Sequence, residues 1–232
     1  MRFRLLIASV VGAGLVLGPE PAIAQHHQTE GKKPSTKESS PLPNCPVKGD
    51  APVNLAVSAA TPEGPVFFCC KDCIPKYQTD PVKFAAQVAT QRKALADRPK
   101  LQVMCPTCNE PADTKITLES GGQKVLFSSA ECIAKYKSDP SKYASALANS
   151  YTYQTKCPVM GEEINPKSFA TLANGAKVYF CCKGCDKKLF AEPAKYAPKL
   201  AIQGIALDPK ELTAAPAKAE PAPEHKGNNH GQ

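Results

Sequence analysis

The chain has 232 residues, a formal net charge of +8, eleven cysteines and no tryptophan. With 6% aromatic, 42% hydrophobic and 22% charged residues, the composition excludes a collagen, a coiled coil or a wholly disordered chain, and argues against one large aromatic core. The lysines are scattered and no aromatic residues are interleaved with them, so nucleic acid is not an expected partner.

Histidine is confined to the two ends of the chain, at His26, His27, His225 and His230. A site in the interior of the sequence must therefore work without imidazole. This argues against a Ser-His-Asp triad, a Cys-His pair and a histidine-rich zinc site.

The N-terminus has the three parts of a secretory signal peptide. Residues 1–4 are basic, residues 5–18 are apolar, and Ala22-Ile23-Ala24 places small residues at the cleavage positions. We therefore expect a signal peptide over 1–24, cut before Gln25, and an exported protein that is periplasmic or extracellular and soluble. The apolar run is shorter than the roughly 20 residues of a spanning helix, so no membrane span is expected after cleavage.

The tails of the mature chain are predicted to be disordered, as a linker over 25–40 and a tail over 213–232 rich in Ala, Pro, Glu and Lys. After cleavage, His27 would be the third residue behind a free amine. Amine, backbone amides and imidazole can together bind Cu(II). The alternative is that His26 and His27 are simply solvated.

One cysteine pattern occurs three times, in copies over 41–98, 101–149 and 153–207. The first and third copies match without a gap: a Cys-Pro-Val-x-Gly turn, an apolar stretch, an adjacent cysteine pair, and a last cysteine three residues on. In the second copy, Ser128 and Ser129 replace the cysteine pair, and the upstream turn is Cys-Pro-Thr-Cys.

Each copy is predicted to contain a cysteine knuckle, a β-hairpin and one or two helices. Apolar alternation predicts strands ending at Phe68, Phe127 and Phe180. Turns are predicted at Gly121-Gly122 and at Asn174-Gly175.

Helices are predicted after the hairpins. Short helices are predicted over 73–77 and 185–190, and a second helix is predicted after Asp80-Pro81 and Asp139-Pro140, where Asp can cap and Pro can occupy the first turn. The fold class is therefore α+β, three treble-clef or zinc-finger-like units in tandem, with linkers over 41–43, 93–100 and 149–155. Units of this size need a metal or a disulfide as a staple.

The cysteine spacing predicts sulfur clusters. Residues four apart share a helix face, so a knuckle thiolate facing the strand-to-helix junction makes a three-sulfur site. Three soft ligands suit Cu(I), and a fourth from Cys70, Cys182, a carboxylate or water suits Zn(II). The candidate metal ligands are Cys45, Cys69, Cys70, Cys73, Cys105, Cys108, Cys132, Cys157, Cys181, Cys182 and Cys185.

Two other uses of the cysteines remain open. Closely spaced cysteines in an exported protein commonly form disulfides, although adjacent ones rarely pair with each other. The Cys105-Pro-Thr-Cys108 pair is also compatible with disulfide exchange, which requires that one of the two thiols titrates well below the usual pKa near 8.5.

The Cys-Pro-Val-x-Gly turn, the Val-Tyr-Phe-Cys-Cys-Lys-Gly-Cys hairpin end and the trailing Pro-x-Lys-Tyr resemble the YHS/TRASH heavy-metal-binding domain family. The resemblance covers the first and third copies, is weaker in the second, and reaches neither tail. It implies binding of soft or transition metals through a Cys-x3-Cys pair and an upstream cysteine, in proteins found beside copper-transporting ATPases, metal sensors and envelope proteins. The residues that match the family's motif are Cys45, Cys69 and Cys73, and Cys157, Cys181 and Cys185.

The expected function is an exported, non-enzymatic heavy-metal-binding protein of the copper or zinc class. It would buffer soft metal ions or pass them on, with a metal-transport protein of the envelope as partner. The alternative is a scaffold whose small domains are stapled by zinc or disulfides, and the third candidate is a thiol-disulfide oxidoreductase. The second copy is either degenerate packing or a different three-sulfur site.

Overall fold

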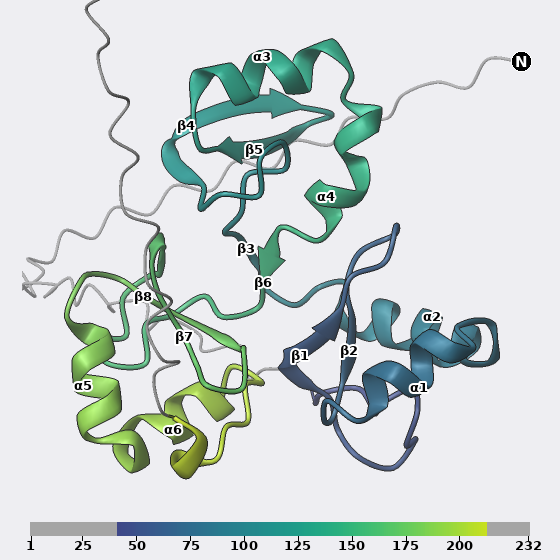
Figure 1. Cartoon of the computed structure of the whole chain (residues 1–232), viewed down its shortest axis with the longest axis vertical. Helices are drawn as coiled ribbons and strands as arrows, with labels where there is room; N and C mark the ends of the chain where they lie inside the picture. Colours follow the sequence, from purple (N-terminus) through teal and green to yellow (C-terminus); the bar gives the residue numbers. More distant parts are fainter. Residues whose placement is uncertain (1–40, 213–232) are drawn as a thin grey trace, which may run out of the picture. The chain divides into compact units, whose positions relative to one another are not determined.

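The computed structural model describes residues 41–212, which belong to one compact unit (Figure 1). The expected signal peptide over 1–24, the linker over 25–40, the tail over 213–232 and all four histidines lie outside the described residues. No helix in the described part is long and apolar enough to cross a membrane.

The architecture is α+β, as the sequence predicts. Its strands form two-stranded antiparallel sheets, and three of these sheets are hairpins followed by helices. The hairpins are β1 (Asn54–Ala59) with β2 (Val66–Phe68), β4 (Asp113–Ser120) with β5 (Gln123–Phe127), and β7 (Asn165–Thr171) with β8 (Lys177–Phe180). Each hairpin has a register shift in its first strand.

The helices follow the hairpins in chain order (Figure 1). After the first hairpin come α1 (Cys73–Thr79), η1 (Val82–Phe84) and α2 (Ala85–Leu95). After the second come α3 (Ala130–Ser138), η2 (Ser141–Tyr143) and α4 (Ala144–Ala148). After the third come α5 (Cys185–Ala191), α6 (Pro193–Ala201) and η3 (Pro209–Glu211).

The local signals in the sequence explain these elements. The second strand of each hairpin ends at the predicted phenylalanine, and the predicted Gly121-Gly122 turn joins β4 to β5. Asp80 and Asp139 each accept a backbone N–H three residues on, at 3.2 Å, so the predicted second helix begins as a capped 3₁₀ turn.

The boundary segment expected over 149–155 is hydrogen-bonded to the residues that follow the one expected over 93–100. Helix α2 continues to Leu95, and β3 (Leu101–Gln102) pairs with β6 (Tyr151–Thr152). The carbonyl of Ser150 also accepts the N–H groups of Val103 and Met104, at 2.8 and 3.2 Å. Hydrogen bonding between the two segments therefore ties the connections into the fold, which short polar stretches do not signal in sequence.

In each hairpin, the side chain of a buried glutamine hydrogen-bonds to backbone groups of the second strand. Gln154 accepts the N–H of Tyr179 at 2.9 Å and donates to its carbonyl at 2.6 Å. Gln102 makes the same pair of bonds to Leu126, both at 2.8 Å. Each glutamine stands three residues before its knuckle cysteine, a repeated signal that the sequence analysis missed.

In the first copy, the glutamine that makes these two hydrogen bonds comes from a helix after the hairpin. Its position three before the knuckle is Leu42, which packs against the hydrophobic core. Gln91 of α2 instead accepts the N–H of Phe67 at 2.9 Å and donates to its carbonyl at 2.8 Å. All three glutamines are buried, so the strands keep their backbone hydrogen bonds without a third strand.

Replacing Gln154 by Leu roughly keeps the side-chain volume but leaves the N–H and the carbonyl of Tyr179 without their hydrogen-bond partner. We expect the free energy of unfolding to fall by about 2 kcal/mol or more. The measurement is the urea midpoint of the reduced, metal-free chain. Gln78→Leu, at an exposed position of α1, is the control and shifts the midpoint little. Equal shifts in the two variants would contradict this role.

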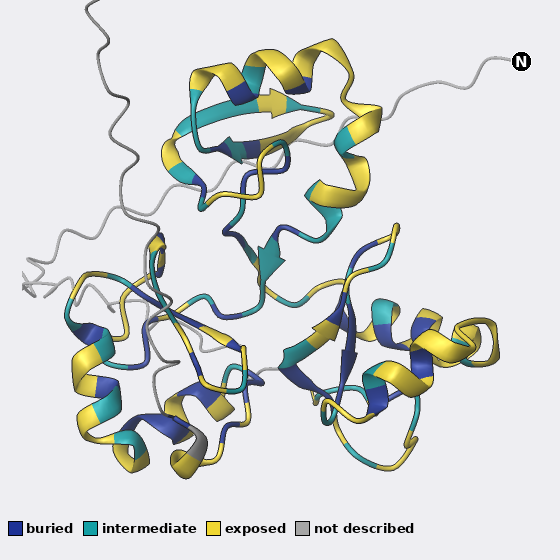
Figure 2. Cartoon of the chain, viewed as in Figure 1, coloured by how far each residue is buried: buried dark blue, intermediate teal, exposed yellow. Residues whose placement is uncertain are grey.

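The first and third copies share one hydrophobic core. Buried residues of β1, β2, α1 and α2 form a single cluster with those of β8, α5 and α6, while the second copy has a smaller cluster of its own. Figure 2 shows the buried residues on the strands and on the helix faces turned toward them. The N–H of Leu55 donates to Gly204 at 2.9 Å, and the Asn54 amide donates to the carbonyl of Ala206.

Where the first and third copies meet, Gly204 should tolerate an added side chain least. Its φ is +86°, and an added Cβ would lie 2.6 Å from Cδ1 of Leu55 and 3.1 Å from Cδ2 of Leu42. We expect Gly204→Ala to destabilise the chain by about 1–3 kcal/mol, through overpacking added to left-handed strain. Gly121→Ala is the matched control, because its φ is +57° and nothing lies within 4 Å. A urea midpoint lowered no more than in the control would count against a shared core.

Candidate metal centre

The three knuckles have one backbone geometry. In the first, Cys45 donates its N–H to Ala51 at 2.7 Å, and its carbonyl accepts the N–H of Gly49 at 2.8 Å. The turn closes with a positive φ of 75° at Gly49, 59° at Asn109 and 77° at Gly161. Asn109 is the only non-glycine residue with positive φ in the described part, and asparagine tolerates this conformation better than most.

Each knuckle directs backbone donors at its cysteine. Burial alone would raise the pKa of Cys45, but N–H groups of Cys69, Lys48 and Val47 hydrogen-bond to its sulfur and lower the pKa. Cys157 receives the equivalent donors, and its pKa is lowered for the same reason. The knuckle therefore favours a thiolate although its sulfur is almost fully buried.

The other cysteines come from the turn between strand and helix. Cys69 and Cys70 follow β2, and Cys73 is the first residue of α1. The expectation that Cys69 and Cys73 share a helix face is wrong, because Cys69 precedes the helix. A tight turn, closed by the Cys73 N–H to the Cys70 carbonyl at 3.3 Å, brings the sulfurs together instead.

The first cluster holds four sulfurs. Those of Cys45, Cys69 and Cys73 lie within 4.8 Å of one another. The Cys69 and Cys73 sulfurs are 3.8 Å apart, and the Cys70 sulfur is 3.8 Å from the former and 3.6 Å from the latter. Knuckle and turn therefore meet as the sequence predicts.

The third cluster repeats this arrangement. The sulfurs of Cys157, Cys181 and Cys185 lie within 4.8 Å of one another. Cys182 places its sulfur 3.5 Å from that of Cys185 and 3.8 Å from that of Cys181, and the latter two are 4.0 Å apart.

The second cluster is a different three-sulfur site. Cys105, Cys108 and Cys132 bring their sulfurs within 4.8 Å of one another. Ser128, at the position of Cys69, lies between two of them, with its hydroxyl 3.0 Å from the Cys108 sulfur and 3.4 Å from the Cys132 sulfur. The knuckle thus supplies the sulfur that the turn lacks, while Ser129 caps α3 by accepting the N–H of Cys132.

These distances fit soft metal ions. A zinc ion with Zn–S bonds of about 2.3 Å separates tetrahedral sulfurs by about 3.8 Å, and a trigonal ion with bonds of that length separates them by about 4.0 Å. The turn sulfurs of the first and third clusters are 3.5–4.0 Å apart. Each triad can therefore hold a metal ion, and the spacing of the turn sulfurs does not select between Zn(II) and Cu(I).

All eleven cysteines lie in the described part, and each is a free thiol. The closest sulfur contacts exceed the roughly 2.05 Å of a disulfide bond by more than an ångström. The structure therefore presents the cysteines as clusters of thiols.

Without an ion, the cluster sulfurs cannot all be ionised together. Burial and hydrogen bonding with the neighbouring thiols raise the pKa of Cys73, and burial followed by the contact with Cys45 raises that of Cys69. In the third cluster burial raises the pKa of Cys181 to about 11. A bound cation would reverse this by taking the place of the protons, so metal binding must release protons.

A lysine faces the first cluster. The exposed side chain of Lys48 has a raised pKa because the charges of Cys70, Cys69 and Cys73 act on it. Lys48 stands three residues after the knuckle cysteine, and the sequence pattern alone does not predict this role.

The second cluster contains an acidic thiol, that of Cys105. Burial opposes ionisation of Cys105, but hydrogen bonds from Thr107 and Ser128 outweigh it and lower the pKa to about 6. Burial raises the pKa of its neighbour Cys108. Burial also opposes ionisation of Cys132, but hydrogen bonds, the largest from Ser128, outweigh it and lower its pKa, so the cluster favours ionisation at two of its three sulfurs.

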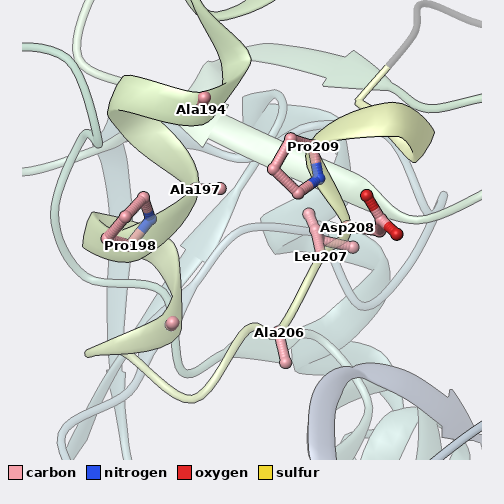
Figure 3. Close-up of a pocket in the computed structure, with 8 residues that line it drawn as sticks. Ala194, Ala197, Pro198, Ala206, Leu207, Asp208 and Pro209 are labelled. Carbon is pink, nitrogen blue, oxygen red and sulfur yellow. The ribbon is translucent and has the colours of Figure 1, made fainter.

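Each cluster also reaches the surface. Cys108 and Cys182 are exposed, and Cys70 is half-buried. A hollow that includes Cys182 is lined by Lys167, Lys183, Lys187 and Asp186, and Lys167 is paired with Asp113. A second hollow, between α6 and η3, is lined mainly by alanine and proline and has one carboxylate, Asp208 (Figure 3). It offers no sulfur or imidazole.

Comparison of the chain with family models, with curated proteins and with solved structures finds no match.

The low pKa of Cys105 predicts a thiolate in the reduced, metal-free chain at pH 7. Because the pKa is lower folded than unfolded, its contribution to stability is complete above the unfolded pKa and disappears as the pH falls through about 6. Ultraviolet thiolate absorbance should therefore show one group titrating near pH 6, lost in Cys105→Ser and kept in Cys69→Ser. A first thiolate appearing only near the pKa of a free thiol, about 8.5, would contradict this assignment.

Proposed function

We propose that this chain is an exported heavy-metal-binding protein of the copper or zinc class, which buffers soft metal ions or passes them on. The observation that carries the proposal is that knuckle and turn bring three sulfurs within 4.8 Å in every copy, including the copy that lost its cysteine pair. A degenerate copy used only for packing has no reason to place a cysteine at a new position of the same cluster.

The exposure of the sulfurs favours exchange over a purely structural role. In each cluster the knuckle cysteine and the first-turn helix cysteine are buried, whereas Cys70, Cys108 and Cys182 face outward to different degrees. An outward thiol can bind an incoming ion before the buried ones do, and release it last. Structural zinc sites are closed by comparison.

The signal peptide expected over 1–24 supports export, and the YHS/TRASH resemblance supports heavy-metal binding. In an envelope compartment a metal-transport protein is the natural source or recipient of the ion. No reaction is proposed, and the chain acts by binding and releasing metal.

The thiol-disulfide oxidoreductase, the third candidate from the sequence, gains some support because Cys105 meets the requirement of a low thiol pKa. However, an attacking thiolate must be accessible, and only 1% of Cys105 is exposed. The accessible member of the pair, Cys108, has a raised pKa. This division suits a buried metal ligand better than an attacking thiol.

The test is metal titration of the full mature chain, reduced and kept free of oxygen, followed by native mass spectrometry. We expect three ions of Cu(I) or Zn(II) per chain, one for each sulfur triad. Cys69→Ser with Cys73→Ser, Cys132→Ser alone, and Cys181→Ser with Cys185→Ser should each remove one ion, because each change leaves its cluster with only two sulfurs. Met104→Leu is the control and should bind three, since Met104 packs in a separate hydrophobic cluster.

Two outcomes would contradict the proposal. One is a reduced chain that binds neither ion with its thiols still reactive. The other is zinc held so firmly that a chelator does not remove it while the chain stays folded, which would favour the scaffold.

A further inference from the structure

The fourth residue of the knuckle differs among the three copies. It is Lys48 in the first, Cys108 in the second and Met160 in the third. The backbone around it is the same, since the next N–H donates to the knuckle cysteine's carbonyl at 2.8, 2.9 and 2.8 Å. The three side chains therefore leave the backbone from equivalent places.

The second copy shows where this position directs a side chain. The sulfur of Cys108 lies within 4.8 Å of those of Cys105 and Cys132. The position therefore directs its side chain at the sulfur cluster in the second copy, and the equivalent backbone geometry lets the side chain of Met160 start from the same place beside the third cluster.

Met160 is unusual in its own right. It is 56% exposed, one of three large apolar residues that the described part leaves open to solvent. A long, flexible thioether at such a position contributes little to packing, but it can turn toward a neighbouring ion.

We propose that the fourth knuckle residue sets the metal preference of each site, and that the thioether of Met160 makes the third site more selective for Cu(I) over Zn(II) than the first. This inference rests on the proposed function, since it presupposes that the clusters bind metal.

The chemistry of the side chains gives the direction. A thioether is a neutral, soft ligand that suits Cu(I) and adds little for Zn(II). A lysine ammonium has three donors and no free electron pair, so Lys48 cannot coordinate. It can only offset the negative charge of the thiolates around the ion.

The test uses the full chain with a single working cluster. Replacing Cys69, Cys73 and Cys132 by Ser leaves the third site, and replacing Cys181, Cys185 and Cys132 by Ser leaves the first. Cu(I) and Zn(II) affinities are measured by competition with chromophoric chelators. In the third-site chain, Met160→Leu keeps the size and removes the sulfur, and we expect Cu(I) affinity to fall about tenfold, as for supporting groups at other metal sites, with Zn(II) affinity unchanged.

The reciprocal variant is made in the first-site chain, where Lys48→Met should raise the preference for Cu(I). A second readout is direct. The chain has three methionines, and signal cleavage leaves Met104 and Met160. With methionine methyl groups labelled for NMR, Cu(I) should shift the Met160 signal and leave Met104 in place, while Zn(II) should shift neither.

The outcomes separate this inference from the function on which it rests. If the parent third-site chain binds both ions and Met160→Leu leaves their ratio unchanged, or the Met160 methyl signal does not respond to Cu(I), the inference is overturned and metal binding stands. If the parent chain binds neither ion, the proposed function itself fails.

Discussion

Three cysteine sulfurs within 4.8 Å of one another are the constraint on which each unit depends. In the first and third clusters the turn sulfurs lie 3.5–4.0 Å apart, so their thiolates would repel one another without a cation between them. Burial and neighbouring thiols accordingly raise the pKa of Cys73 and Cys185, whereas knuckle N–H groups lower the pKa of Cys45 and Cys157. In these two clusters the knuckle cysteine therefore favours the thiolate, while the cysteine at the start of the helix favours the neutral thiol. A bound soft cation would stabilise the thiolate form of both.

The rest of each unit holds the knuckle against the turn. A two-stranded hairpin is marginal alone, and buried Gln91, Gln102 and Gln154 complete the hydrogen bonds of its outer strand. Glutamines from different elements make the same two bonds, so the requirement lies in the strand and not in one sequence position. A core common to the first and third copies adds apolar burial that a single copy lacks.

Local patterns in the sequence were enough to predict the strands, the hairpin turns, the capped helices and the two matching triads, because repetition exposed them. Long-range pairing was not predictable: the Gln91 contact and the β3–β6 pair bring together residues from separate segments, and no local propensity records that. The second site was left open between degenerate packing and a different three-sulfur site, because Ser128 and Ser129 replace the cysteine pair. The structure places both Cys105 and Cys108 beside Cys132, since the Asn109 turn matches that of Gly49 and directs Cys108 to the cluster.

The central claim is that the sulfurs of the cysteine clusters bind the ion. X-ray absorption at the metal edge of the chain loaded with Zn(II) or Cu(I) tests it most directly. The account predicts a shell of three or four sulfurs at about 2.3 Å and no nitrogen from imidazole. A shell dominated by nitrogen or oxygen would contradict it, because the ion would then lie outside the three cysteine clusters.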